Sequence, residues 1–233
     1  ANVAFNFSRK QLVLDGASLA GEPGKFLIAR AAPRSLVDED FAAGASRRPT
    51  LRLSSHFKVT LDPARYELGN LADGLVGFDV WKRWTIAVDY HKRLITLIDG
   101  PLERTDLARF PFSGLPALPV LIDDQNYSAI VDTALPDNLL LPLALNPAGR
   151  VSGRGTISLT MAGRRFDHVD VAYGATSSVR IGNRMLSNFL LFIDYPEQWV
   201  GLWYDSRPRA GSGGGGMTVA TGKQVAVTAP AAD

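Results

Sequence analysis

The sequence contains no cysteine and only three histidines among its 233 residues. Without cysteine the chain has no disulfide framework, no thiol nucleophile and no thiolate to bind a metal. The histidines, His56, His91 and His168, are isolated and lack the spacing of a metal-binding motif. We therefore expect neither a metal site nor a cofactor.

Long apolar runs and a strong charge of one sign are also missing. No run approaches the ~20 apolar residues that a membrane-spanning helix requires, so we expect no membrane span. The net charge is +2, and the basic residues are scattered along the chain, so nothing indicates nucleic-acid binding. The first residue is Ala1 rather than Met, which suits a processed start and favours a periplasmic or secreted protein, although the compartment stays unknown.

What the chain does contain is a succession of short segments in which apolar residues alternate with polar ones. This pattern predicts an all-β protein with many short strands. The predicted strands lie within residues 1–16, 26–28, 50–68, 85–98, 118–131, 155–173 and 189–204. Short helical patterns are limited to residues 37–43 and 79–84, and residues 100–118, rich in Pro and Gly, are predicted to connect two halves.

The two halves repeat the same motifs at nearly constant spacing. Residues 77–81 (Gly-Phe-Asp-Val-Trp) correspond to residues 182–186 (Gly-Asn-Arg-Met-Leu), 105 positions later. Val88-Asp89-Tyr90 and Ile193-Asp194-Tyr195 are also 105 positions apart, whereas Phe26 to Ala29 fall on Ala129 to Asp132 and Leu36 falls on Leu139, 103 positions apart. The repeat predicts two duplicated lobes, residues 1–103 and 104–208.

Residues 129–142 combine an apolar strand, an acid, a hydroxyl, a small residue and a second apolar run. Asp132-Thr133-Ala134 in this stretch resembles the Asp-Thr-Gly loop of the aspartic proteases, pepsin-like and retropepsin-like, with Ala134 replacing the glycine. In that family the loop crosses a segment of the form apolar-apolar-Gly, which residues 74–77 and 179–182 match. The resemblance covers residues 1–205 and is strongest to bacterial retropepsin-like proteins. It implies a bilobal pepsin-like fold of two duplicated β-barrel lobes with a cleft between them.

The same resemblance implies that each lobe supplies one catalytic aspartate, and that the two carboxylates share a proton and activate a water. Asp132 and Thr133 match the motif of the second lobe, but Ala29, Arg30 and Ala31 stand where the first lobe needs its motif. A lone carboxylate cannot act as base and acid together. Arg30 near Asp132 would also favour its charged form.

Three hypotheses remain open. The first is a pseudoprotease with a degenerate first lobe, which binds an extended polypeptide in its cleft without cleaving it. The second is an aspartic endopeptidase in which an Asp-to-Ala change at residue 29 was introduced to trap a substrate. The third is a structural β-protein whose cleft has no function. The residue at position 29 in the natural gene distinguishes the first two.

The expected peptide-binding residues follow from the family resemblance. They are Ala29, Arg30, Ala31 and Ala134 at the base of the cleft, with Tyr66 and Tyr173 on hairpins 50–68 and 155–173 that correspond to the family's flaps. Core packing is the alternative role for both tyrosines.

The C-terminal tail has a different composition from the rest of the chain. Residues 209–216 have the composition of a flexible Gly/Ser linker, and Met217 then begins a segment that extends to residue 233. We interpret residues 217–233 as a tethered peptide from the N-terminal segment of another protein, placed as an extended strand in the cleft. The predicted partner is therefore an extended polypeptide.

Overall fold

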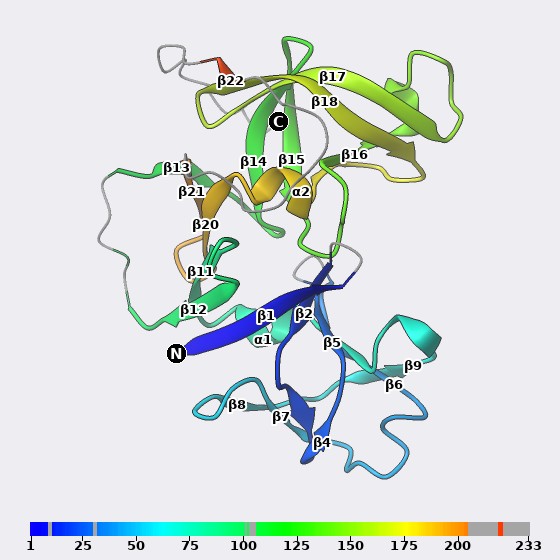
Figure 1. Ribbon diagram of the computed structural model, residues 1–233, viewed down its shortest axis with the longest axis vertical. Coiled ribbons are helices and arrows are strands. Elements are labelled where there is room, and N and C mark those ends of the chain that lie inside the picture. Colours follow the sequence, from blue (N-terminus) through cyan, green and yellow to red (C-terminus); the bar gives the residue numbers. More distant parts are fainter. Residues whose placement is uncertain (9–10, 30–31, 101, 103–105, 205–218, 221–233) are drawn as a thin grey trace.

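The computed structural model describes residues 1–8, 11–29, 32–100, 102, 106–204 and 219–220, and these form a predominantly β molecule (Figure 1). In the first half the strands are β1 (Asn2–Ser8), β2 (Gln11–Leu14), β3 (Ser18–Leu19), β4 (Glu22–Pro23), β5 (Phe26–Ile28), β6 (Leu36–Asp38), β7 (Thr50–Arg52), β8 (Lys58–Thr60), β9 (Ala64–Tyr66), β10 (Gly74–Val76), β11 (Thr85–Asp89) and β12 (Leu94–Ile98). The helices there are the 3-10 turn η1 (Gly69–Leu71) and α1 (Phe78–Trp81).

The second half also consists mainly of short strands. Its strands are β13 (Ala108–Pro111), β14 (Ala117–Ile122), β15 (Gln125–Val131), β16 (Leu139–Pro142), β17 (Gly153–Met161), β18 (Arg164–Gly174), β19 (Val179–Ile181), β20 (Phe189–Asp194), β21 (Trp199–Tyr204) and β22 (Val219–Ala220), with helices η2 (Leu143–Leu145) and α2 (Asn183–Leu186). The all-β prediction is confirmed. Residues 100–118, which were predicted to connect the two halves, contain β13 and the start of β14.

The helix expected over residues 37–43 is wrong. Leu36 to Asp38 form strand β6, and the Asp38 carboxylate then accepts hydrogen bonds from the backbone N–H groups of Asp40 and Phe41. This side-chain-to-backbone pattern is a turn, which competes with helix formation. The second predicted helix is present as α1, a single turn.

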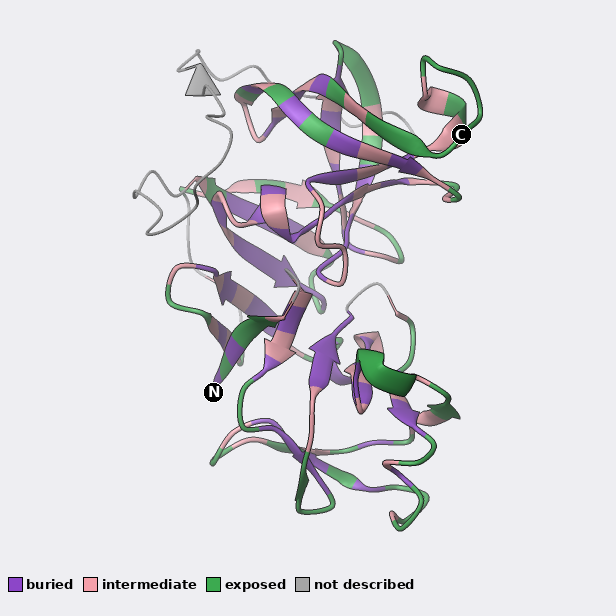
Figure 2. Cartoon of the chain, turned by 45° about the vertical axis from the view of Figure 1, so that its right-hand side comes forward, coloured by how far each residue is buried: buried purple, intermediate pink, exposed green. Residues whose placement is uncertain are grey.

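Six strands of the second half close into a barrel. The pairing runs β14–β15–β19–β16–β18–β17 and returns to β14. Each of these six strands therefore pairs with two neighbours, and the barrel is closed. Along β17 and β18 buried and more exposed residues alternate, which places Leu159, Met161, Phe166 and Val171 in the core (Figure 2). This alternation is the one that a half-buried strand requires.

The corresponding strands of the first half stay open. The run β2–β5–β10–β6–β9 ends at β9, and a separate four-stranded sheet, β4–β3–β7–β8, lies at the end of the molecule opposite the barrel (Figure 1). Two barrels were expected, and among the described residues only the second half forms one. The reason is length: β9, which pairs with β6 as β18 pairs with β16, has three residues, whereas β18 has eleven.

The two halves are joined by an antiparallel ladder between β11 and β20. Ala87 pairs with Phe192, its own counterpart 105 positions later. Ile86 pairs with Ile193, and Val88 pairs with Leu191. With the same offset of 105, Ile86 corresponds to Leu191 and Val88 to Ile193, so each of these pairs is the counterpart of the other. The ladder is therefore symmetric about this pair, as a duplicated protein with an approximate two-fold axis requires.

Candidate functional site

The loop that follows β5 and the loop that follows β15 have the same backbone construction. β10 runs parallel to β5 with Val76 opposite Ile28, and β19 runs parallel to β15 with Ile181 opposite Val131. Each loop then begins with the same hydrogen bond. The N–H of Ala29 donates to the Val76 carbonyl at 3.1 Å, and the N–H of Asp132 donates to the Ile181 carbonyl at 2.9 Å.

The turns after Ala29 and Asp132 are equivalent as well. The N–H of Ala32 donates to the Ala29 carbonyl at 2.9 Å, and that of Leu135 donates to the Asp132 carbonyl at 3.2 Å. The one difference is an extra residue in the second loop. Leu36 pairs with Leu75 and Leu140 pairs with Arg180, so Leu36 corresponds to Leu140 and not, as the sequence offset suggested, to Leu139.

A glycine lies where each loop crosses its second segment. A Cβ added to Gly182 would lie 2.3 Å from the Asp137 carbonyl oxygen, and one added to Gly77 would lie 2.6 Å from the Arg34 carbonyl. Because both contacts are with backbone, neither crossing has room for a side chain. Glycine at both crossings therefore has a steric reason.

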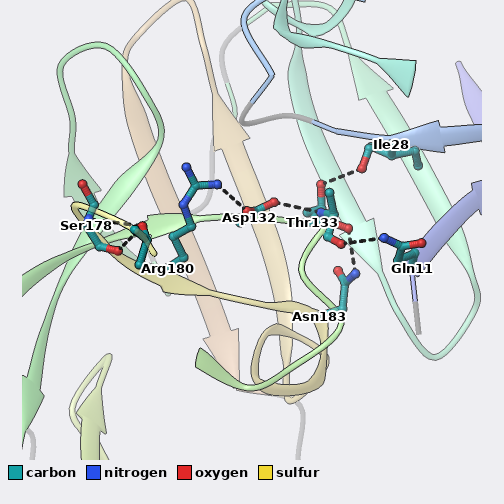
Figure 3. Close-up of polar contacts among 9 residues, drawn as sticks. Gln11, Ile28, Asp132, Thr133, Ser178, Arg180 and Asn183 are labelled. Carbon is teal, nitrogen blue, oxygen red and sulfur yellow. Dashed lines mark hydrogen bonds and ion pairs between the residues drawn. The ribbon is translucent and has the colours of Figure 1, made fainter. Parts of the chain in front are cut away.

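The two loops contact each other (Figure 3). The Thr133 hydroxyl donates to the carbonyl of Ile28, the residue before Ala29, at 3.3 Å. Gln11 of β2 donates through Nε2 to the Ala134 carbonyl at 3.2 Å. Ala29 and Asp132 are both buried, with 5% and 6% exposure. The structure thus brings Asp132, Thr133 and Ala134 against the Ala29 loop, whereas Arg30 and Ala31 lie outside the described residues.

Both oxygens of the Asp132 carboxylate have partners. Oδ1 accepts the N–H of Ala134 at 3.0 Å, and Oδ2 accepts Nη1 of Arg180 at 2.8 Å in an ion pair (Figure 3). The Arg180 side chain is 35% exposed, whereas that of Asp132 is 8% exposed. Among the described residues, the cation beside Asp132 is therefore Arg180 of β19.

Sequence reasoning missed Arg180, although a signal was present. Arg180 interrupts the apolar-apolar-Gly segment of the second half, at the position that Leu75 holds in the first half. A charged residue in the middle of a short buried strand needs a partner of opposite charge. Asp132 was the acid in the same predicted crossing.

A second set of contacts ties the Asp132 loop to the first half. Asn183, the first residue of α2, donates through Nδ2 to the Thr133 carbonyl at 2.7 Å and accepts the Tyr90 hydroxyl at 3.1 Å. At the equivalent place in the other half, Phe78 packs edge-on against Tyr195 with ring centroids 5.2 Å apart. The contact of Asn183 with Tyr90 is thus polar, whereas the equivalent contact of Phe78 with Tyr195 is aromatic.

The two predicted tyrosines lie in different environments. Tyr66 on β9 is 61% exposed, so the core-packing alternative is wrong for it. Tyr173 on β18 is 5% exposed and packs against the backbone of Gly155, where an added Cβ would meet its ring at 2.8 Å. Burial raises the pKa of the Tyr173 phenol above its ordinary value, with a smaller contribution from Asp123. Within the described part of the chain, neither tyrosine is hydrogen-bonded to the Asp132 carboxylate.

The described part of the tail is strand β22, which pairs with Arg165 and Phe166 of β18. These residues belong to hairpin β17–β18, which corresponds to one of the two predicted flaps. Residues 221–233, and with them most of the segment predicted to lie in the cleft, are outside the described residues. The placement of the peptide in the cleft stays a prediction.

No group of three or more His, Asp or Glu side chains among the described residues is placed to hold a metal ion, and no helix there is long and apolar enough to cross a membrane. A scan against models of protein families finds no match to the chain, and a search of curated proteins finds no significant relative.

Proposed function

We propose that the chain is a two-lobed aspartic-protease-like protein that binds an extended polypeptide segment between its lobes and does not cleave it. Three features support the family assignment: the duplicated loops after Ile28 and Val131, the crossing glycines, and the symmetric ladder between β11 and β20. The proposal follows the resemblance of Asp132-Thr133-Ala134 to the Asp-Thr-Gly motif. It places the peptide over the junction of the two loops.

The contacts of the Asp132 carboxylate are the main support for the proposal that the peptide is not cleaved. In an aspartic protease two carboxylates hold one water, and they exchange roles as base and acid. Here the position equivalent to Asp132 is occupied by Ala29, and Oδ2 of Asp132 is bound by Arg180 at 2.8 Å. A carboxylate fixed in an ion pair, without a second acid opposite, cannot carry out both proton transfers.

The chemistry is tested by incubating the purified protein with a mixed peptide pool between pH 3 and pH 7 and analysing the products by mass spectrometry. We expect no cleavage above that of the Asp132→Asn variant. Cleavage by the parent protein that the Asp132→Asn change abolishes would contradict the proposal and favour the endopeptidase hypothesis. Size-exclusion chromatography in the same buffers shows whether two chains associate, in which case activity could come from two paired Asp132 loops.

Peptide binding is tested with a free peptide of residues 217–233 and a protein that ends at Arg209. We expect binding with protection from hydrogen exchange in residues 64–76 and 129–135, which contain β9, β10 and the Asp132 loop. The exposed Tyr66 provides a variant, Tyr66→Ala, that should weaken binding without changing the fold. Protection confined to β18 would assign the peptide to the barrel edge, and the absence of binding would refute a peptide-binding function for this segment.

A further inference from the structure

A cavity of about 340 Å³ lies in the first half of the molecule, separate from the Asp132 loop. It is enclosed by β6, by β9 with the two residues before it, and by the loop of residues 42–49 (β6 and β9 are adjacent in Figure 1). Its volume falls within the range of about 300–1,000 Å³ that is typical of small-molecule sites. We call it the basic cavity, defined by Val37, Ala42, Ala45, Pro49, Pro63 and Ala64 and by the polar residues described next.

Six of the residues that line the basic cavity are apolar, and none of these six has a bulky side chain. Val37, Ala42 and Pro49 are buried, and Ala45, Pro63 and Ala64 are half-buried. Small residues on facing segments leave the space open, and they offer an apolar surface that a ligand can cover.

The exposed residues around this space are mainly arginines. Arg34, Arg47 and Arg65 line the cavity together with Asp62, which is the one acid among its described lining residues. Asp62 is already engaged, because Arg34 donates Nε and Nη2 to its carbonyl at 2.9 and 2.7 Å and lies 3.4 Å from its carboxylate. One of the three positive charges is therefore balanced.

Arg47 and Arg65 remain to attract an anion. Nη2 of Arg65 donates to the Ala45 carbonyl at 3.2 Å, which fixes the side chain over the cavity without neutralising its charge. A guanidinium presents its donors in a planar fork that matches the two oxygens of a carboxylate or phosphate. The cavity thus combines cationic side chains with a set of small apolar residues.

We propose that the basic cavity binds a small organic oxyanion, with its charged group between Arg47 and Arg65 and its apolar body against Val37, Ala42 and Pro49. A volume of about 340 Å³ corresponds to roughly ten water molecules at ~30 Å³ each, and so to a ligand of about ten non-hydrogen atoms. None of the residues that line this site is among those proposed to contact the peptide, although Ala64 and Arg65 precede Tyr66 in β9.

Phenylacetate, which has ten non-hydrogen atoms, is a suitable probe. Titration calorimetry with the full chain should detect binding with a dissociation constant of about 1 mM, as expected for a ligand of this size. Phenylacetamide has the same shape without the charge and should bind at least about tenfold more weakly. Inorganic phosphate tests the oxyanion site without the apolar body, and should also bind more weakly than phenylacetate.

Three variants locate the site. Arg47→Gln and Arg65→Gln each remove one charge from the rim and should weaken phenylacetate binding about tenfold. Arg48→Gln removes the neighbouring charge, which does not line the cavity, and should leave binding within about twofold. All three positions are exposed, and equal urea midpoints confirm that the fold is unchanged.

Two results would overturn the proposal. One is the absence of phenylacetate binding at 10 mM, or binding that Arg47→Gln and Arg65→Gln leave unchanged. The other is phosphate binding as strong as that of phenylacetate, because the apolar interior would then contribute nothing and the ligand would not be an organic one.

Discussion

Replacement of Gly182 by alanine should destabilise the protein severely, for a purely steric reason. The new Cβ would lie 2.3 Å from the Asp137 carbonyl oxygen and 2.6 Å from that of Leu135. The N–H of Gly182 donates to Asn138 at 2.8 Å and the N–H of Asn183 donates to Leu135 at 2.8 Å, so the two segments cannot separate without losing hydrogen bonds. The φ of Gly182 is −102°, which any residue adopts, so backbone strain contributes nothing.

The magnitude follows from the size of the overlap. Overpacking of a rigid site costs about 1–3 kcal/mol and occasionally more, and contact with two backbone oxygens places this change at about 3 kcal/mol or above. With a urea m-value of about 2–3 kcal/mol/M, the midpoint of unfolding should fall by at least about 1 M. Tryptophan fluorescence during urea unfolding measures the shift.

Gly44→Ala is the matched control, because a Cβ at Gly44 meets nothing within 4 Å and its φ lies outside the left-handed region. That variant should equal the parent protein or gain up to about 1 kcal/mol, since alanine restricts the unfolded chain. If Gly182→Ala unfolds within about 0.3 M of Gly44→Ala, the close crossing of the two segments is wrong.

Two further predictions concern buried polar contacts. Thr85→Val removes the 2.8 Å hydrogen bond to the buried Asp194 carboxylate and should lower the free energy of unfolding by about 1–3 kcal/mol in the same urea assay. Thr96→Val removes an exposed hydrogen bond to Asn2 and should lower it by less than about 0.5 kcal/mol. Equal effects of the two changes would contradict the importance given to burial. Backbone N–H groups, chiefly that of Leu68, hold the pKa of Asp38 below its ordinary value. The charged form therefore stabilises the fold above about pH 4, and this contribution is lost as the pH falls toward the lower folded pKa. Asp38→Asn should be less stable than the parent at pH 7, by a margin that narrows at pH 3, and an unchanged margin would contradict this reasoning.

The features that the sequence predicted are those encoded locally or by repetition. Alternation of apolar residues indicated the strands, and the offsets of 103 and 105 indicated two loops of the same kind with a glycine at each crossing. Sheet closure was not predictable in this way. It depends on whether β18 and its counterpart β9 are long enough to bridge two neighbours, which repeated motifs elsewhere in the chain do not determine.

The wrong helix over residues 37–43 has a comparable cause. The Asp38 carboxylate accepts N–H groups of Asp40 and Phe41 nearby, and also those of Leu68 and Gly69, thirty residues further along the chain. A contact across that separation in the sequence leaves no periodic signal. The local pattern around residue 38 therefore suggested one structure, and the tertiary contact selects another.

Arg180 shows how the site itself departs from the symmetry of the chain. Its counterpart Leu75 occupies an equivalent strand position, and an arginine there would be costly unless an acid lay within reach. Asp132 provides that acid at 2.8 Å, whereas the corresponding Ala29 provides none beside Leu75. Each half thus contains a matched pair at these two positions: the apolar Ala29 and Leu75 in the first half, and the oppositely charged Asp132 and Arg180 in the second. The pairing of residues 132 and 180 explains how a single carboxylate is retained in a buried position without a second one opposite. A change at residue 29 alone would therefore not restore a symmetric pair of acids, because Arg180 would still bind one of them.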